Sequence, residues 1–183
     1  MFICVDVDNV LNNLQEAVID LFNERHETNY TVDDFTEYDV SKVLPMQEAA
    51  EMQHMYCETG IYNRVKPLDT AREGLKKLID AGHQVLLVTA SESRIFDEKV
   101  KWINHYFPFV KNENIVLMYP KHLLKCDVLI EDNLQTLLDG HYYDRFCFDW
   151  PWNRTTKDWV YDIIRVYNWD EIINEINKRS DID

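Results

Sequence analysis

The chain has 183 residues, 46% of them apolar and 13% aromatic, which suffices for the packed core of one domain and excludes a disordered chain. Its formal net charge of -14 argues against duplex nucleic acid as a partner, because such binding depends on clustered lysines and arginines. A small anionic substrate remains compatible with this charge if a bound cation reverses the local field. No apolar run is long enough to span a membrane, and Asp6 and Asp8 interrupt any N-terminal signal sequence, so we expect a cytoplasmic protein.

Cysteine and histidine spacing does not indicate a metal site. The four cysteines are scattered, and Cys4, Cys126 and Cys147 lie in or beside apolar runs typical of reduced core thiols. The six histidines show no ligand spacing, which argues against zinc. With only four glycines the chain also lacks a Gly-rich phosphate loop, which argues against dinucleotide enzymes and common NTPases.

In chain order, short apolar runs alternate with helical patterns, which is typical of a parallel sheet with crossover helices. The predicted strands cover Phe2–Val7, Gln84–Thr89, Ile115–Met118, Val128–Glu131 and Arg145–Phe148. The predicted helices cover about Leu14–Glu24, Gln47–Glu58, Leu68–Ala81, Ile95–Tyr106, Asn133–Leu138 and Trp169–Lys178. We therefore expect an α/β fold, with a Rossmann-like parallel sheet and helices on both faces.

The connection between the first two predicted strands is unusually long. It spans roughly 75 residues, whereas a simple crossover needs about a dozen or a little more. We interpret residues 14–65 as a small helical cap inserted after the first strand, with 1–13 and 66–183 as the core domain. Because the insertion begins directly after Asp6 and Asp8, it is expected to lie over the crevice like a lid.

Three predicted strands end in residues suited to phosphate chemistry. Asp6 and Asp8 follow the first strand, Thr89 ends the second, and Glu131 and Asp132 end the fourth. The carboxyl ends of strands in an open α/β sheet form the ligand crevice, so these side chains are expected to meet. With 33 acidic residues, a solvated acidic turn is the plainer interpretation of Asp6 and Asp8 alone, but it leaves the other strand ends unexplained. The pattern predicts a phosphotransfer site.

Phosphomonoester hydrolysis needs a nucleophile, a proton donor for the leaving oxygen, and positive charge around the phosphoryl group. Asp6 is the predicted nucleophile, and Asp8 is placed to protonate the leaving oxygen and then deprotonate water. Two such carboxylates repel an anionic substrate unless a hard cation lies between them, and Mg²⁺ suits that position. Either Asp132 or Glu131 would complete the metal ligands.

The phosphoryl oxygens also need donors from the protein. Thr89 offers a hydroxyl and neighbouring backbone N–H groups at its strand end. Lys121 and Lys99 are the candidates for the fixed cation, Lys121 by its position, whereas a helical lysine such as Lys99 is more often a solvated charge.

The residues resemble the haloacid dehalogenase superfamily of aspartyl phosphotransferases, and within it the 5'(3')-deoxyribonucleotidases. The first motif is matched by D-V-D-N-V-L at residues 6–11 and the second by L-L-V-T-A-S at 86–91. The third and fourth motifs lie together in Y-P-K-H-L-L-K-C-D-V-L-I-E-D at 119–132, and E-K-V-K-W-I at 98–103 also resembles the nucleotidases. The similarity covers most of the chain in order.

The resemblance implies a Mg²⁺-dependent phosphatase with an aspartyl-phosphate intermediate, acting on (deoxy)nucleoside monophosphates. It implies Asp6, Asp8 and Asp132 as metal ligands, and phosphate binding by Thr89, Ala90 and Lys121. It also implies a base pocket of cap aromatics. The proposed pocket residues are Leu14, Phe35, Tyr56, Tyr62, Lys99 and Arg154.

The sequence departs from this family at several positions. Asn9 replaces the usual glycine, and asparagine tolerates left-handed backbone better than most residues. Ala90 stands where the nucleotidases often have serine, Glu131 replaces the first aspartate of an acidic pair, and Leu14 and Tyr56 replace Phe and Trp. Because these changes alter the shape of the expected pocket, the sequence does not identify the substrate.

Several alternatives remain at this stage. The cap aromatics could simply form the core of the insertion, and Trp150 and Trp152 could pack the sheet edge while Arg154 reaches the phosphate or the cap. The same chemistry could serve another small phosphate ester, such as a sugar phosphate, or the chain could be an idle relative that binds nucleotides or a protein. An idle binder has no need of a nucleophile, so the intact set of site residues argues against this alternative. The set consists of Asp6, Asp8, Thr89, Lys121 and Asp132. The sequence leaves a homodimer open.

Overall fold

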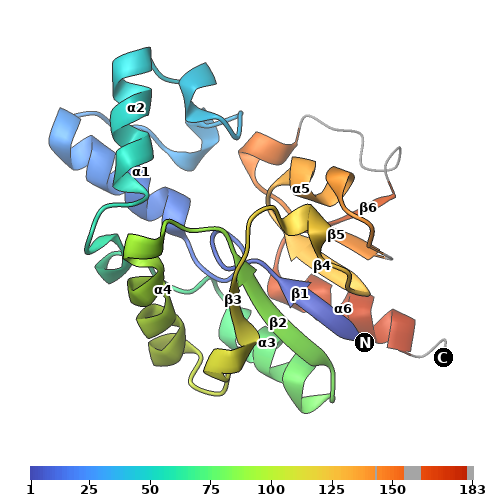
Figure 1. Cartoon of the computed structure of the whole chain (residues 1–183). Helices are drawn as coiled ribbons and strands as arrows, with labels where there is room; N and C mark the ends of the chain where they lie inside the picture. Colours follow the sequence, from blue (N-terminus) through green and yellow to red (C-terminus); the bar gives the residue numbers. More distant parts are fainter. Residues whose placement is uncertain (143, 155–161, 181–183) are drawn as a thin grey trace.

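The computed structural model describes residues 1–142, 144–154 and 162–180, and within these residues its centre is a sheet of six strands (Figure 1). The strands are β1 (Phe2–Val5), β2 (Gln84–Thr89), β3 (Ile115–Leu117), β4 (Val128–Glu131), β5 (Asp144–Phe148) and β6 (Ile163–Val166). Their order is β3-β2-β1-β4-β5-β6 and every pairing is parallel. The expected α/β fold with a parallel sheet is confirmed.

Strands β3 and β5 differ from the prediction by one residue, since β3 ends at Leu117 and β5 begins at Asp144, and two larger differences concern β1 and β6. Strand β1 ends at Val5, two residues before the expected Val7, because the chain leaves the ladder to form the loop that carries Asp6 and Asp8. Strand β6 was not predicted: it has four residues at the sheet edge, including Arg165, and pairs with β5 through its backbone. So short a run gives little periodic signal in the sequence.

The helices are α1 (Leu14–His26), α2 (Met46–Met55), α3 (Ala71–Asp80), α4 (Ser93–Tyr106), α5 (Leu134–Asp139) and α6 (Trp169–Ser180). Short 3₁₀ turns cover Val32–Asp34, Val40–Lys42, Ile61–Asn63, Asn112–Asn114, Lys121–Leu123 and Pro151–Asn153. Helix α3 begins three residues after the predicted Leu68 because Thr70 has a left-handed φ of 60° and the Leu68 N–H bonds to Leu11 O instead. Within the described residues, no helix combines the length and apolar character needed to cross a bilayer.

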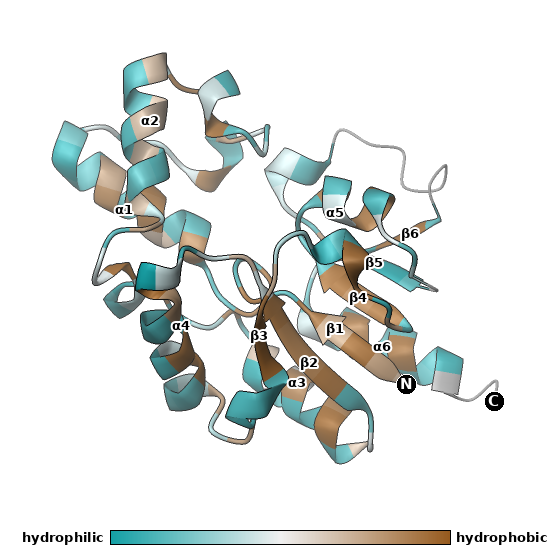
Figure 2. Cartoon of the chain, viewed as in Figure 1, coloured by the Kyte–Doolittle hydropathy of each residue, from teal (hydrophilic) through white to brown (hydrophobic). Residues whose placement is uncertain are grey.

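Helices cover both faces of the sheet. Alternate strand residues such as Ile3, Leu87 and Ile130 pack in one cluster with α3, α4 and α6, whereas residues such as Cys4 and Leu129 pack in a second cluster with α5. Figure 2 shows β1, β2, β3 and β4 among the most hydrophobic parts of the chain, whereas β5 includes hydrophilic residues. The cysteines Cys4, Cys126 and Cys147 are free and buried, as expected of core thiols.

Helices α1 and α2 lie beyond the carboxyl ends of the strands (Figure 1). They pack against each other, and the first apolar cluster continues through buried residues such as Phe22 of α1, Met52 of α2 and Phe35 of the segment between them. Residues 14–65 thus supply the elements over the predicted crevice, as expected of a cap. Their status as a domain separate from residues 1–13 and 66–183 stays a prediction.

Trp169 of α6 ties the sheet to the loop after β1. Its side chain is fully buried, and its indole Nε1 donates a hydrogen bond of 2.8 Å to Val10 O. Gly74 of α3 makes room for this ring, since a Cβ there would lie 2.6 Å from Trp169 Cε3.

We therefore expect Gly74→Ala to destabilise the protein. Overpacking against a buried ring costs about 1–3 kcal/mol, which outweighs the gain of up to about 1 kcal/mol in helix propensity. Urea unfolding should show a lower free energy of unfolding for Gly74→Ala, and a change within about 0.5 kcal/mol for the exposed control Lys77→Ala. A more stable Gly74→Ala protein would contradict this packing.

Candidate active site

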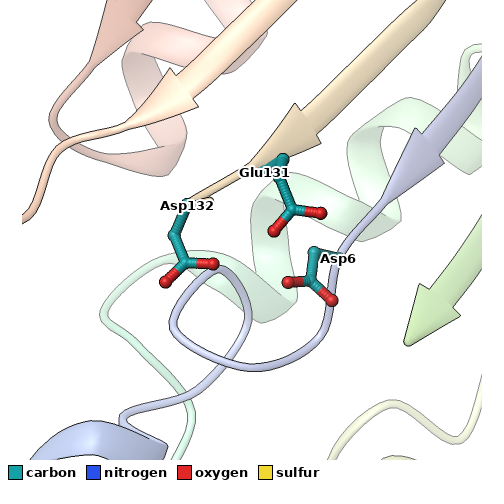
Figure 3. Close-up of side chains that lie close together, drawn as sticks. All are labelled: Asp6, Glu131 and Asp132. Carbon is teal, nitrogen blue, oxygen red and sulfur yellow. The ribbon is translucent and has the colours of Figure 1, made fainter. Parts of the chain in front are cut away.

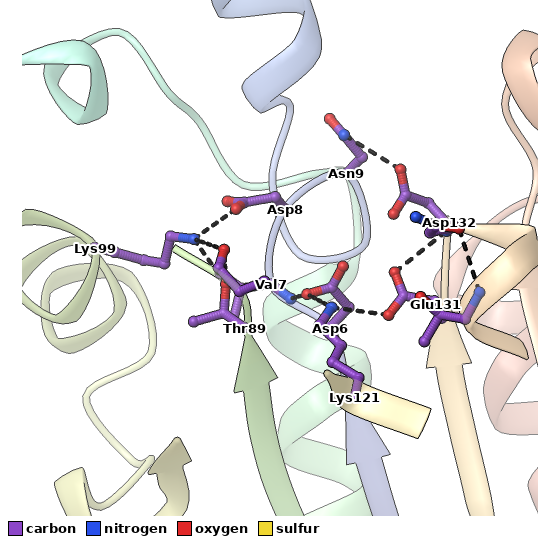
Figure 4. Close-up of polar contacts among 12 residues, drawn as sticks. Asp6, Val7, Asp8, Asn9, Thr89, Lys99, Lys121, Glu131 and Asp132 are labelled. Carbon is purple, nitrogen blue, oxygen red and sulfur yellow. Dashed lines mark hydrogen bonds and ion pairs between the residues drawn. The ribbon is translucent and has the colours of Figure 1, made fainter. Parts of the chain in front are cut away.

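The loop after β1 sends the Asp6 and Asp8 side chains in different directions. The Asp6 N–H donates to Ile130 O on β4 at 2.9 Å, and the Val7 N–H donates to Asp6 Oδ1 at 2.7 Å. Asn9 then adopts the left-handed φ of 59° expected of it. As a result Asp6 faces Lys121 and Glu131, whereas Asp8 faces Lys99 (Figure 4).

Asp6, Glu131 and Asp132 form a cluster of buried carboxylates. One oxygen from each lies within 4.8 Å of the others, and the three groups surround one space at the ends of β1 and β4 (Figure 3). Lys121 Nζ lies 2.7 Å from Asp6 Oδ1 and 2.8 Å from Glu131 Oε2. Lys121, the predicted phosphate-binding lysine, therefore lies at the carboxylate cluster. Glu131 is a third member of that cluster beside Asp6 and Asp132.

The cluster carries more negative charge than Lys121 neutralises. Burial raises the pKa of Asp6, and the neighbouring Glu131 charge raises it further. Burial also raises the pKa of Asp132 to about 7, with a further contribution from the Asp6 charge. A divalent cation would supply the missing positive charge, and carboxylate oxygens are the ligands that hard cations such as Mg²⁺ prefer. These residues fit such an ion.

Asp8 lies outside this cluster, in a second ionic group. Its carboxylate accepts hydrogen bonds of 2.6 Å from Lys99 Nζ, 2.6 Å from the Tyr62 hydroxyl and 3.1 Å from Asn12 Nδ2. Burial alone would raise the pKa of Asp8, but the Lys99 charge and the three hydrogen bonds outweigh it and lower that pKa. The side chain of Asp8 is thus ion-paired with Lys99. The role of Asp8 as a metal ligand stays a prediction.

Lys99 is a buried, ion-paired residue beside Asp8 rather than a solvated helix charge. Its side chain is 1% exposed, and Nζ donates to Thr89 Oγ1 at 2.7 Å as well as to Asp8. Helix α4 therefore contributes a second fixed cation at the end of β2. The solvated alternative was wrong because the neighbours that bury Lys99 come from distant parts of the sequence.

Asp132 is held by donors that the sequence did not indicate. Its Oδ2 accepts hydrogen bonds from Trp152 Nε1 at 3.1 Å and from Asn9 Nδ2 at 3.3 Å, and its main-chain O accepts from Asn153 Nδ2 at 2.9 Å. Trp150 stacks on Trp152 with a centroid distance of 5.0 Å and donates to Asn9 O. For Trp150, Trp152 and Asn153, the only signal in the sequence was their position after the fifth predicted strand.

A cavity of about 210 Å³ opens between this edge of the sheet and the cap. Its lining includes Asp8, Leu14, Gln15, Phe35, Tyr38, Tyr56, Ala90, Lys99 and Trp152. Four of the six predicted pocket residues thus line one space. Of the remaining two, Tyr62 contacts Asp8 instead.

Arg154 is not brought to this cavity. Its side chain is 55% exposed, its guanidinium pairs with Asp149 at 2.7 Å, and it is not part of the cavity lining. Asp149 itself also pairs with Arg165 at 2.8 Å. The expected contact of Arg154 with substrate stays a prediction, and in this structure its charge is paired with Asp149.

Curated relatives resemble this chain over most of its length. A protein of Bacillus subtilis named 5'(3')-deoxyribonucleotidase is 24% identical over 172 residues, covering 93% of this chain and 95% of its own. A Staphylococcus epidermidis protein named putative 5'(3')-deoxyribonucleotidase is 27% identical over 137 residues, covering 74% of this chain and 75% of its own.

Solved structures share the fold at low sequence identity. A haloacid dehalogenase family hydrolase from Deinococcus radiodurans, solved with bound phosphate and sodium, has a TM-score of 0.64 at 13% identity and covers 97% of this chain and 95% of its own. A haloacid dehalogenase-like hydrolase from Streptococcus pneumoniae has a TM-score of 0.61 at 13% identity and covers 95% of this chain and 97% of its own.

The family model described as "5' nucleotidase, deoxy (Pyrimidine), cytosolic type C protein" matches residues 1–180. This match spans both the sheet and the capping helices, and it includes every residue of the carboxylate cluster. The chain therefore belongs to this nucleotidase family, shares the fold of haloacid dehalogenase-like hydrolases, and is a phosphoric monoester hydrolase.

Proposed function

We propose that the protein is a Mg²⁺-dependent 5'(3')-deoxyribonucleotidase that forms an aspartyl-phosphate on Asp6. The observation that carries the proposal is the Asp6 carboxylate, which is anchored by Lys121 beside an under-neutralised carboxylate cluster and close to a cavity with aromatic walls. The names of the relatives support a nucleoside monophosphate as substrate.

In the first step, Asp6 attacks phosphorus. Its Oδ1 is held by the Val7 N–H and by Lys121, so we assign the attack to Oδ2. As the new P–O bond forms, the bond from phosphorus to the nucleoside oxygen breaks, and the leaving oxygen takes a proton from Asp8. Water then attacks phosphorus, Asp8 accepts its proton, and inorganic phosphate leaves with Asp6 restored.

Asp8 must carry a proton when the substrate is bound, although Lys99 lowers its pKa in the free protein. An anionic phosphate beside Lys99 would offset the ammonium charge and so favour the protonated acid. Thr89, whose hydroxyl oxygen lies 2.7 Å from Lys99 Nζ, and the backbone N–H of Ala90 would donate to phosphoryl oxygens in the same region.

Asp6 and Asp132 would hold Mg²⁺, with Glu131 beside them and Asp8 as the further predicted ligand. The bound ion would neutralise phosphate charge and so let an anionic substrate approach the carboxylates. Lys121 keeps its charge there, because the nearby Asp6 and Glu131 carboxylates outweigh the effect of burial and raise its pKa.

The first test concerns the nucleophile. Asp6→Asn keeps the side-chain shape but removes the attacking charge, so we expect kcat to fall by about 10⁴-fold or more. The fold should persist, because the change relieves repulsion among buried carboxylates. Phosphate release is measured alongside the exposed control Asp97→Asn, which should behave as wild type. Near-normal turnover by Asp6→Asn would exclude the covalent mechanism.

The second test concerns the cation. EDTA should abolish phosphate release and Mg²⁺ should restore it. Mg²⁺ should also raise the melting temperature of the wild-type protein, because a ligand that binds the folded state stabilises it. Asp132→Ala should need a higher Mg²⁺ concentration for the same shift. Full activity in excess chelator would rule out the metal assignment.

The third test concerns the base pocket. Stacking on an aromatic ring contributes about 1–3 kcal/mol per base, so Tyr56→Ala should raise KM for deoxynucleoside monophosphates about ten-fold or more. Turnover of p-nitrophenyl phosphate should change little, because this small ester makes few contacts with the cap. An equal loss on both substrates would show that Tyr56 only supports the cap, and no loss on either would place the base elsewhere.

A further inference from the structure

Asn9 does more than accommodate a left-handed turn. Its φ of 59° is a conformation that glycine adopts at least cost. Nevertheless the residue is an asparagine, it is only 9% exposed, and both polar atoms of its amide are bonded. The side chain therefore has a role beyond the backbone conformation.

The two bonds of the Asn9 amide join the metal site to the cap. Asn9 Nδ2 donates to Asp132 Oδ2 at 3.3 Å, and Asn9 Oδ1 accepts from the Gln15 N–H at 2.9 Å. Gln15 is in the first turn of α1, where backbone N–H groups have no partner within the helix. The N-cap residue Asn13 makes no side-chain cap hydrogen bond, so the loop supplies the acceptor instead.

Gln15 extends this connection into the cavity. Its side chain is 7% exposed, and its Oε1 accepts a hydrogen bond from the Tyr56 hydroxyl of the cap. Burial raises the pKa of Tyr56, so the hydroxyl keeps the proton that it donates. Gln15 and Tyr56 both line the cavity, which lies between the cap and the sheet edge.

We propose that Asn9 is a positioning residue that couples cation binding at Asp132 to nucleoside binding in the cap pocket, through its hydrogen bond from the Gln15 backbone N–H and the bond from the Tyr56 hydroxyl to the Gln15 side chain. This inference rests on the proposed function. A cation on Asp132 fixes the carboxylate that Asn9 contacts, so the cap residues are already ordered when the nucleoside binds. By linkage, the nucleoside must strengthen cation binding by the same factor.

Trp152 provides a matched comparison. Its indole donates to the same Asp132 Oδ2, at 3.1 Å, but it comes from the segment after β5, and among the described residues this N–H does not bond to the cap. Trp152→Phe therefore removes one support of the cation ligand and leaves the connection to α1 intact. Asn9→Gly removes both bonds of the amide and keeps the backbone conformation, while Tyr56→Phe keeps the ring and removes only the last hydrogen bond.

The experiment measures binding rather than turnover. Calorimetric titration gives the Kd of Mg²⁺, and the Kd of deoxyuridine with and without Mg²⁺, for the wild type and the three variants. Deoxyuridine carries no phosphate, so any effect of Mg²⁺ on its affinity passes through the protein. In the wild type, we expect Mg²⁺ to tighten deoxyuridine binding by about five-fold.

The variants separate positioning from coupling. Asn9→Gly weakens Mg²⁺ binding by about ten-fold and abolishes the effect of Mg²⁺ on deoxyuridine, as expected when a supporting partner of a metal ligand is lost. Tyr56→Phe keeps the wild-type Mg²⁺ affinity but loses the coupling. Trp152→Phe weakens Mg²⁺ binding and keeps the coupling.

Two results would overturn the inference while leaving the proposed function intact: equal deoxyuridine affinity with and without Mg²⁺ in the wild type, or unchanged coupling in Asn9→Gly. A wild type that hydrolyses other phosphate esters but binds no deoxyuridine would instead overturn the nucleotidase proposal and, with it, the coupling to a nucleoside. In that case the Mg²⁺ affinity of Asn9→Gly still decides whether Asn9 positions Asp132.

Discussion

Uncompensated negative charge at the carboxyl edge of the sheet is the constraint on which the site depends. Asp6, Glu131 and Asp132 are nearly inaccessible to water, and the pKa values of Asp6 and Asp132 are raised because burial and mutual repulsion disfavour their charged forms. Lys121 alone does not balance them. The arrangement is costly for an isolated chain and favourable for one that takes up a cation and a phosphate.

The fold maintains this arrangement from several directions. Parallel pairing of β1 with β4 sets Asp6 next to the acidic end of β4, and Trp169 fixes the following loop from the opposite side. Asp8 is turned to a separate cation, Lys99, by the same loop. In the proposed mechanism, Lys121 therefore lies on the side of the nucleophile Asp6 and Lys99 on the side of the proton donor Asp8.

The sequence predicted the parts of this protein that depend on local pattern. Apolar runs located five of the six described strands, and the acidic and hydroxyl residues at their ends identified Asp6, Asp8 and Asp132 as site candidates. Strand β6 was missed because four residues with a polar member give too little periodicity.

Features that depend on three-dimensional neighbours could not be predicted in this way. The burial of Lys99 results from the packing of α4 against the end of β2, and a single lysine in a helix carries no sign of it. Trp152 and Asn9 lie at distant positions in the chain yet donate to one oxygen of Asp132. The pairing of Arg154 with Asp149 likewise depends on the folded structure and had no signal in the sequence.

The central claim, a phosphoryl group carried covalently on Asp6, is tested most directly by acid-quenched single turnover with a deoxynucleoside monophosphate and Mg²⁺. Mass spectrometry of the digested protein should find one phosphoryl group on the peptide that contains Asp6. The adduct should rise and decay as phosphate is released, and hydroxylamine should remove it. A phosphoryl group on another residue, or phosphate release with no adduct on Asp6 at any quench time, would contradict the account.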